Sequence, residues 1–408
     1  MTTAKKTILL PFILMITSLL WGAENRQNEN ILDEIDRLIA NRQYQTAWTT
    51  LHDRAEALET GDMILKKTEL TLLYYTKTNL HQMFAFSDLK EGENLSDARA
   101  GDGNFDFKLF DPAGALSLVI SSEPGRTEAY FWLGEYYYQV MNLYAEVWDK
   151  PVQEIRSLVL ANFKMAVSLG METEEIYSKM AYTELLSANW EGALKDLEKA
   201  LIFNPGNPSY YHDKAVASLN LGHHTDALAS ARQAMEEYKN PFYKADSAFL
   251  ASTIALHMGE SGTAEDYLVK GAAYSPDDYR FPDRLIRLYL NDGEYEKARK
   301  AAGNLFALYP DNPANCTTII QYFYNIGKLE ETELFFTEQL DKFSGNPAAR
   351  GNLFFHKGIA AKYRGLNTQA LEAFENAEDE FKKSYAPDNP VFAAIDNMRA
   401  ELRTLLQE

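Results

Sequence analysis

The chain has 408 residues, of which 46% are hydrophobic and 24% are charged, a balance typical of a folded protein rather than a disordered one. Its 59 acidic and 40 basic side chains give a formal net charge of −19, which disfavours nucleic acid and anionic membrane surfaces as partners. The single cysteine excludes an internal disulfide, so packing alone must stabilise the fold.

The N-terminus has the pattern of a secretory signal peptide. Lys5 and Lys6 precede the apolar run TILLPFILMITSLLW, and Gly-Ala follows it. This run is shorter than the roughly 20 residues of a permanent transmembrane helix. We therefore expect residues 1–23 to be a signal peptide that exports the chain to a bacterial periplasm. Trp21 stands where a small residue is preferred before the cleavage site, which leaves open an uncleaved segment anchored in the inner membrane.

Residues 28–173 are expected to form helix pairs that carry two insertions. Apolar residues recur at helical spacing through residues 31–58, and the same arrangement can be set in register twice more before residue 173. The second of these pairs is about 31 residues too long and the third about 13 residues too long for a regular period. The excess places the insertions at about residues 81–111 and 141–157.

The first insertion is expected to contain an extended segment, NFDFKLF at 104–110, after a polar and glycine-rich loop. We expect residues 79–89 to continue the preceding helix and Asp111-Pro112 to start the next one. No partner strand is apparent, so a β-sheet is not expected. The alternating apolar side chains should lie on neighbouring helices as a flap over the groove, and whether that flap is a lid or a filler stays open. They are Phe105, Phe107 and Leu109.

The same stretch contains the start of a calcium-loop pattern. Asp102, Asn104 and Asp106 have the spacing of the first three ligands of such a loop. The loop then requires a glycine and, six residues further on, a bidentate glutamate. Phe107 and Ala113 occupy these two positions. We therefore expect no metal site here.

The second insertion is expected to lengthen both helices of its pair. Aromatic residues keep a spacing of three to four through this region, and Lys150-Pro151 then interrupts the helix. The result should be a long hairpin with an aromatic tip formed by Tyr144 and Trp148. Either the tip packs on itself, or it shields or binds another group.

Residues 174–384 repeat at a nearly constant period. Segments 176–208 and 210–241 align with small residues 34 positions apart, which let two helices approach closely. These pairs are Ala181 and Ala215, Ala188 and Gly222, Ala193 and Ala227, and Ala200 and Ala234. Glycine recurs where a first helix should end, because glycine adopts the left-handed conformation of a helix C-terminus. These glycines are Gly222, Gly259, Gly293, Gly327 and Gly365.

This pattern resembles the tetratricopeptide repeat, most specifically in NWEGALKDLEKALIFNPGNP (189–208) and NDGEYEKARKAAGNLFALYPDNP (291–313). The resemblance implies an all-α fold: a right-handed superhelical solenoid of about nine helix pairs. Its concave groove would be lined by the first helix of each pair. Residues 388–408 would form a helix that caps the last apolar face.

The second, fifth, ninth and twelfth places of each repeat should face that groove. Aromatic and arginine side chains among them suit capture of a peptide or ligand. The candidates for partner binding are Phe131, Glu135, Tyr138, Tyr182, His212, Phe249, Arg280, Asp283, Arg287, Gln321 and Tyr324. The clamp type of this family, which holds an acidic C-terminal peptide, uses Lys and Asn at set places. Tyr182, His212 and Val216 stand there in this chain, so that specificity is not supported.

No catalytic, cofactor or metal signature occurs in the sequence, so we expect neither an enzyme nor a cofactor. We expect a scaffold of the cell envelope that binds a protein or peptide partner. The alternative is a periplasmic ligand-binding module that accompanies a solute transporter, which resembles this chain only at the level of the repeats. An enclosed apolar cavity would favour the ligand, and an open polar groove would favour the protein partner.

Overall fold

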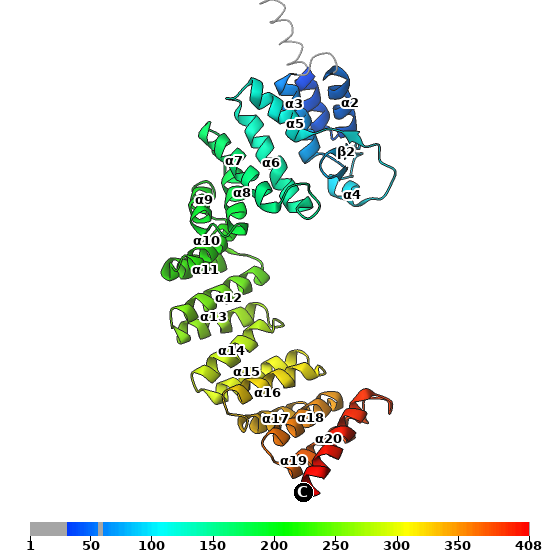
Figure 1. The fold of residues 1–408 in the computed structure, drawn as a ribbon, viewed down its shortest axis with the longest axis vertical. Helices are drawn as coiled ribbons and strands as arrows, with labels where there is room; N and C mark the ends of the chain where they lie inside the picture. The colour runs from blue at the N-terminus through cyan, green and yellow to red at the C-terminus, as the bar shows by residue number, and fades with distance from the viewer. Residues whose placement is uncertain (1–30, 56–59, 408) are drawn as a thin grey trace, which may run out of the picture. The chain divides into compact units, whose positions relative to one another are not determined.

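The computed structural model describes residues 31–55 and 60–407, and these residues are mostly helical (Figure 1). They form nine successive helix pairs and a last single helix, which confirms the expected all-α repeat fold. The predicted signal peptide, residues 1–23, lies outside them. None of the described helices is both long and apolar enough to cross a membrane. The chain divides into two compact units, which we call unit 1 (residues 1–205) and unit 2 (residues 206–408).

Unit 1 begins with a helix over residues 31–40 and contains four helix pairs within its described part. The further elements are α2 (Tyr44–Ala55), α3 (Gly61–Leu73), β1 (Lys77–Asn79), β2 (Met83–Ala85), α4 (Leu95–Ala100), β3 (Lys108–Leu109), α5 (Pro112–Ser122), α6 (Thr127–Tyr144), α7 (Val152–Ser168), α8 (Glu174–Leu186) and α9 (Trp190–Phe203). Helices α6 and α7 have 18 and 17 residues, against 13 and 14 in α8 and α9. This pair is therefore a long hairpin.

Unit 2 contains five helix pairs and the last helix. They are α10 (Pro208–Asn220), α11 (His224–Glu237), α12 (Pro241–His257), α13 (Ser261–Tyr274), α14 (Arg280–Asn291), α15 (Tyr295–Leu308), α16 (Pro313–Asn325), α17 (Glu331–Lys342), α18 (Pro347–Tyr363), α19 (Asn367–Phe381) and α20 (Pro390–Gln407). Ile395 and Leu402 of α20 are buried against α19, so α20 covers the last apolar face of the stack.

Local sequence determines where the helices of unit 2 begin and end. The first helix of every pair ends before a glycine whose φ lies between 69° and 77°, a conformation that is costly for residues with a Cβ. Four first helices begin with an Asn-Pro step, in which the asparagine side chain accepts a backbone hydrogen bond and proline occupies the first turn. These steps start α10, α12, α16 and α18. The predicted glycine stops are therefore confirmed.

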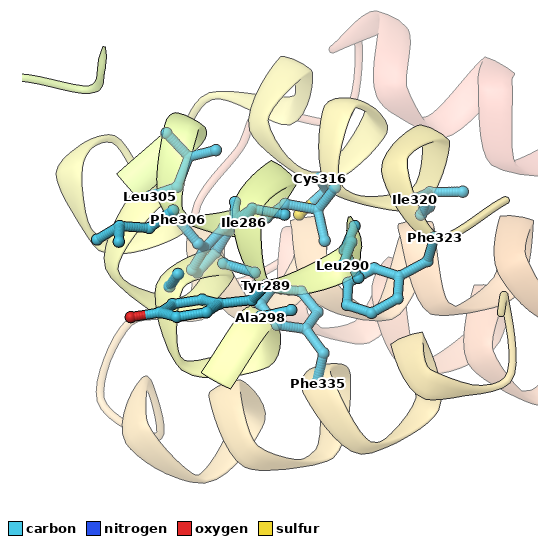
Figure 2. Close-up of a cluster of buried hydrophobic side chains, with 14 of the residues drawn as sticks. Ile286, Tyr289, Leu290, Ala298, Leu305, Phe306, Cys316, Ile320, Phe323 and Phe335 are labelled. Atoms are coloured by element: carbon cyan, nitrogen blue, oxygen red, sulfur yellow. The ribbon is translucent and has the colours of Figure 1, made fainter. Parts of the chain in front are cut away.

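The largest core cluster of unit 2 is formed by side chains from the helices α12 to α18 (Figure 2). Phe281, Phe306, Phe323 and Phe335 are fully buried in it. Cys316 belongs to the same cluster, and burial raises the pKa of its thiol. The cysteine therefore serves as a small apolar side chain, because a thiol that stays protonated is a poor nucleophile.

The connection between α3 and α5 corrects two expectations. Residues 79–89 do not continue the helix, since α3 ends at Leu73. A three-stranded antiparallel sheet also follows it, in the order β1-β2-β3, with Lys77 opposite Ala85 and Met83 opposite Leu109. The extended segment before α5 therefore pairs with a strand, β2. From here on, residues 74–111 are called the insertion.

The sheet was missed because its turn lacks the usual signal. Leu80 and His81 both have positive φ, at 49° and 48°, which a tight hairpin normally provides with Asn-Gly or Asp-Gly. His81 is held there by burial and by a 2.9 Å contact between its Nε2 and Oε1 of Gln139 on α6. A tertiary contact therefore stabilises a backbone conformation that the local sequence disfavours.

Candidate functional site

The predicted groove residues of unit 1 lie on α6 and α8 and are largely occupied with internal contacts. Glu135 is buried and pairs with Lys179, and its other oxygen accepts a hydrogen bond from Gln139. The ring of Phe131 packs against Trp132 and Phe163, with centroids 5.0 and 6.2 Å apart. The ion pair of Glu135 with Lys179 and the packed ring of Phe131 therefore mainly stabilise the interfaces between these helices.

Tyr138 and Tyr182 form the accessible part of this surface. Their rings lie 6.2 Å apart in an edge-to-face arrangement, and the ammonium group of Lys179 lies 5.2 Å from the ring centre of Tyr138. Tyr182 is exposed, whereas Tyr138 is half-buried. An exposed tyrosine packed on a half-buried one beside a cation offers flat apolar area at a low entropic cost.

The first helices of unit 2 carry a continuous charged network. His212 of α10 lies between Asp213 and Asp246, and Asp246 of α12 also accepts a 3.0 Å hydrogen bond from Arg280 of α14. Arg280 in addition contacts Asp278, at 2.8 to 3.1 Å. Burial would lower the pKa of His212, but the two carboxylates outweigh it and raise this pKa to about 9. The imidazole is therefore positively charged at neutral pH.

A second network lies one turn further along α14. Arg287 donates hydrogen bonds of 3.2 and 2.8 Å to the hydroxyl oxygen of Tyr322 on α16. Its guanidinium also pairs with Asp283 at 3.2 Å, and the hydroxyl of Tyr322 donates to Asp283. These contacts tie two neighbouring first helices together, and they fix Arg287 and Asp283 in place.

An open pocket of about 270 Å³ lies between α12 and α14. We call it the arginine pocket; it is lined by Phe249, Tyr279, Arg280, Asp283, Arg284 and Arg287. The guanidinium carbons of Arg280 and Arg284 lie 5.0 and 5.2 Å from the ring centre of Phe249, within the range of cation–π contacts. Two guanidinium groups over an aromatic ring, with that of Arg287 in the same pocket, can hold an anionic or planar group.

The structure thus brings four of the predicted residues together, on the same side of α12 and α14: Phe249, Arg280, Asp283 and Arg287. Arg284 and Tyr279 were not among the predicted residues, because only four places of each repeat were expected to face the groove. Arg284 is four residues after Arg280, a spacing that puts the two on one helix face and that could have identified it.

The remaining predicted groove residues of unit 2 are on α16. Gln321 and Tyr324 are both exposed, and the ring of Tyr324 lies 5.9 Å from that of Tyr363 on α18. The amide of Gln321 donates a 2.6 Å hydrogen bond to Asn325. Tyr324 therefore presents half of its side chain for contact with a partner.

The proposed flap does not lie on helices as expected. Leu109 is 79% exposed and Phe107 is also exposed, so the prediction that these side chains pack on neighbouring helices is wrong for both. The neighbouring residue Phe110 packs instead, in an edge-to-face contact 5.8 Å from Trp48. Pairing of β3 with β2 sets which side chains face the core, and this register turns Leu109 outward.

Phe105 alone among the three remains half-buried. Its ring lies 5.4 Å from the ammonium of Lys77 and 6.5 Å from the ring of Phe107. It lines an open pocket of about 240 Å³, together with polar residues of α2 and of the insertion. This pocket is polar at its rim, where Asp106 and Lys108 pair at 2.7 Å.

The aromatic tip of the long hairpin contacts the insertion. The ring of Tyr144 lies 5.2 Å from that of His81 and 6.3 Å from that of Trp148. Trp148 in turn lies 6.2 Å from Tyr136, which is buried. These side chains pack on one another, as the simpler of the two interpretations expected, and they also hold the β1–β2 hairpin.

No group of three His, Cys, Asp or Glu side chains within residues 31–55 and 60–407 is arranged to hold a metal ion. The acidic side chains of the pocket region are instead paired with arginine and histidine, as described above. The site therefore offers hydrogen bonds, charge and aromatic surface.

The fold and this surface define a class of proteins built from stacked helix pairs. No model of a known protein family matches the chain, and no curated protein matches it. Among solved structures, it is similar to a tetratricopeptide repeat protein from Parabacteroides merdae, with 14% identity, a TM-score of 0.40, and coverage of 67% of this chain and 98% of that one.

Two further structures are similar over part of the chain. The C-terminal part of a TPR repeat-containing protein from Cytophaga hutchinsonii shares 12% identity and covers 62% of this chain and 100% of its own, with a TM-score of 0.42. The MamA protein shares 20% identity and covers 42% and 93%, with a TM-score of 0.35. The helix pairs themselves, rather than these likenesses, define the fold.

Proposed function

We propose that this chain is a non-enzymatic scaffold of the bacterial cell envelope that binds a protein or peptide along its first helices. The observation that carries the proposal is the arginine pocket, where aromatic and guanidinium groups from α12 and α14 converge on one open surface. Side chains of these types dominate the binding energy of protein interfaces. The polar lining favours a protein partner over an apolar small molecule.

Export is part of the same proposal and rests on residues 1–23 alone. A charged start, an apolar run and a small-residue exit support a signal peptide. N-terminal sequencing of the protein from a periplasmic extract tests this. A chain that begins after Ala23 supports cleavage, whereas a chain that keeps the apolar run and sediments with membranes supports the anchored alternative.

Affinity selection from a library of random peptides tests the binding surface. The full chain is immobilised, the enriched peptides are sequenced, and their affinities are measured by calorimetry for the wild type and for Tyr324→Ala. We expect this substitution to weaken binding about tenfold, as loss of an aromatic anchor does.

Tyr309→Ala is the matched control. Tyr309 is 57% exposed and Tyr324 is 56% exposed, but Tyr309 follows the second helix α15, whereas Tyr324 lies on the first helix α16. Equal losses for both variants, or no enriched peptide at all, would contradict the proposal that the first helices form the binding surface.

A further inference from the structure

The three guanidinium groups of the arginine pocket differ in how they are paired. Arg280 is engaged by Asp278 and Asp246, and Arg287 by Asp283 and Tyr322. Arg284 forms no ion pair and no hydrogen bond from its guanidinium within the part of the chain that the structure describes; its guanidinium carbon lies 5.2 Å from the ring centre of Phe249. Arg284 is thus the one guanidinium of this pocket whose donors are unused.

The stacking of Arg284 on Phe249 leaves those donors available. A guanidinium that lies over an aromatic ring uses its flat face, and its N–H groups point outward in its own plane. The edge-to-face contact of 5.8 Å between Phe249 and the buried Phe281 fixes the ring below it. The donor group is therefore held on a rigid support.

The unpaired positive charge of Arg284 disfavours a basic ligand in this pocket. Arg280 and Arg287 lie on either side of it along α14, and both are held in place by acids of this chain. The net charge of −19 is spread over the whole chain, and salt screens it beyond about 8 Å under physiological conditions. A direct contact with Arg284 is screened much less.

We propose that the arginine pocket receives an acidic side chain, Asp or Glu, from within a bound peptide segment, and that Arg284 donates to its carboxylate. Phe249 and Tyr279 supply apolar surface for the aliphatic part of that side chain and for an apolar neighbour. Arg280 and Arg287, each paired with acids of this chain, flank Arg284 as fixed side chains. This inference rests on the proposed function and names the class of residue that the surface recognises.

A synthetic library of random peptides with acetylated N-termini and amidated C-termini tests the inference, because only side chains can then supply carboxylates. We expect the peptides that the full chain enriches to share one Asp or Glu near an apolar residue. Changing that acid to its amide should weaken binding to the wild type about tenfold, the typical loss for a charge-assisted hydrogen bond. The same change should have no effect on binding to Arg284→Gln.

Arg232→Gln is the control for net charge. Arg232 is 62% exposed on α11, a second helix, and its loss changes the chain's charge by the same amount. We expect it to keep the wild-type preference for the acid. Arg284→Lys should recover part of the affinity, because it keeps the charge but not the planar fork. Circular dichroism of each variant checks that it is folded.

Four results would overturn the inference. Enriched peptides without a shared acid, or an acid-to-amide effect that persists in Arg284→Gln, would exclude Arg284 as the recognising group. Selective enrichment from a matched library with free C-terminal carboxylates would assign the pocket to a chain end instead. In these cases binding that still depends on Tyr324 would leave the proposed function standing, whereas the absence of any enriched peptide would refute both.

Discussion

Gly271 on α13 lies against the buried ring of Phe281, and this contact makes a quantitative prediction. A Cβ at position 271 would lie 2.1 Å from Cε1 and 2.4 Å from Cζ of that ring. Phe281 is fully buried and supports Phe249 of the arginine pocket. The ring therefore cannot move aside without disturbing the pocket.

Gly271→Ala combines two opposing effects on the free energy of unfolding. Replacing a helical glycine with alanine stabilises by about 1 kcal/mol. Overpacking a closed core costs about 1–3 kcal/mol, and a contact this short should approach the upper end. We therefore expect a net destabilisation of about 2 kcal/mol. Gly262→Ala in the same helix is the control, because nothing lies within 4 Å of its added Cβ, and it should not destabilise.

The effect should be local and should depend on the phenyl ring. Hydrogen exchange of the amides of α13 and α14 in the intact chain measures the free energy of local opening without assuming two-state unfolding. Phe281→Leu removes the ring atoms that clash, so it should abolish most of the penalty of Gly271→Ala in the double variant, with a coupling of about 1–2 kcal/mol. Equal protection of these amides in Gly271→Ala and Gly262→Ala would refute the packing argument.

Two further predictions concern unit 1. Leu109→Ala should change the free energy of unfolding by less than about 0.5 kcal/mol because the side chain is exposed. Phe110→Ala should lower it by about 2–3 kcal/mol because the ring packs on Trp48. Urea unfolding measures both, and equal effects would contradict the register of β3. Burial lowers the pKa of His81 to about 4, so its contribution to stability is complete above pH 6.5 and is lost as the pH falls toward 4, by at most about 1.4 kcal/mol per unit. His81→Asn, which tolerates the positive φ, should flatten this part of the stability profile, and an unchanged slope would exclude His81 as its cause.

Much of the fold follows from local features of the sequence. Each glycine that ends a first helix adopts the left-handed conformation, as Gly222 and Gly293 illustrate, and an Asn-Pro step starts most of the first helices in unit 2. Such signals act through the backbone of a few neighbouring residues, so they can be identified from sequence alone. In unit 2 these signals mark the order of the helix pairs, whereas in unit 1 the pairs follow from the apolar periodicity.

The insertion shows where local signals fail. Alternation in NFDFKLF correctly indicated an extended segment, but it could not reveal which face would be buried, because β2 determines the register. The positive φ of His81 likewise depends on a contact with Gln139 of α6, which lies 58 residues further along the chain. Pairing between distant segments decided both features.

The candidate site also combines features that local sequence predicts with features that only tertiary packing decides. Helical spacing was sufficient to place Arg280, Asp283 and Arg287 on one face of α14, because side chains three and four residues apart are neighbours on any helix. Only the tertiary structure showed that Asp246 and Tyr322 contact two of the three arginines from other helices, whereas Arg284 has no such polar partner among the described residues. The sequence by itself therefore determined the repeat and its helix faces, since both depend on short-range geometry. The packing of successive pairs decided which contacts form between helices, because Asp246 and Tyr322 lie 34 and 35 residues from the arginines that they contact.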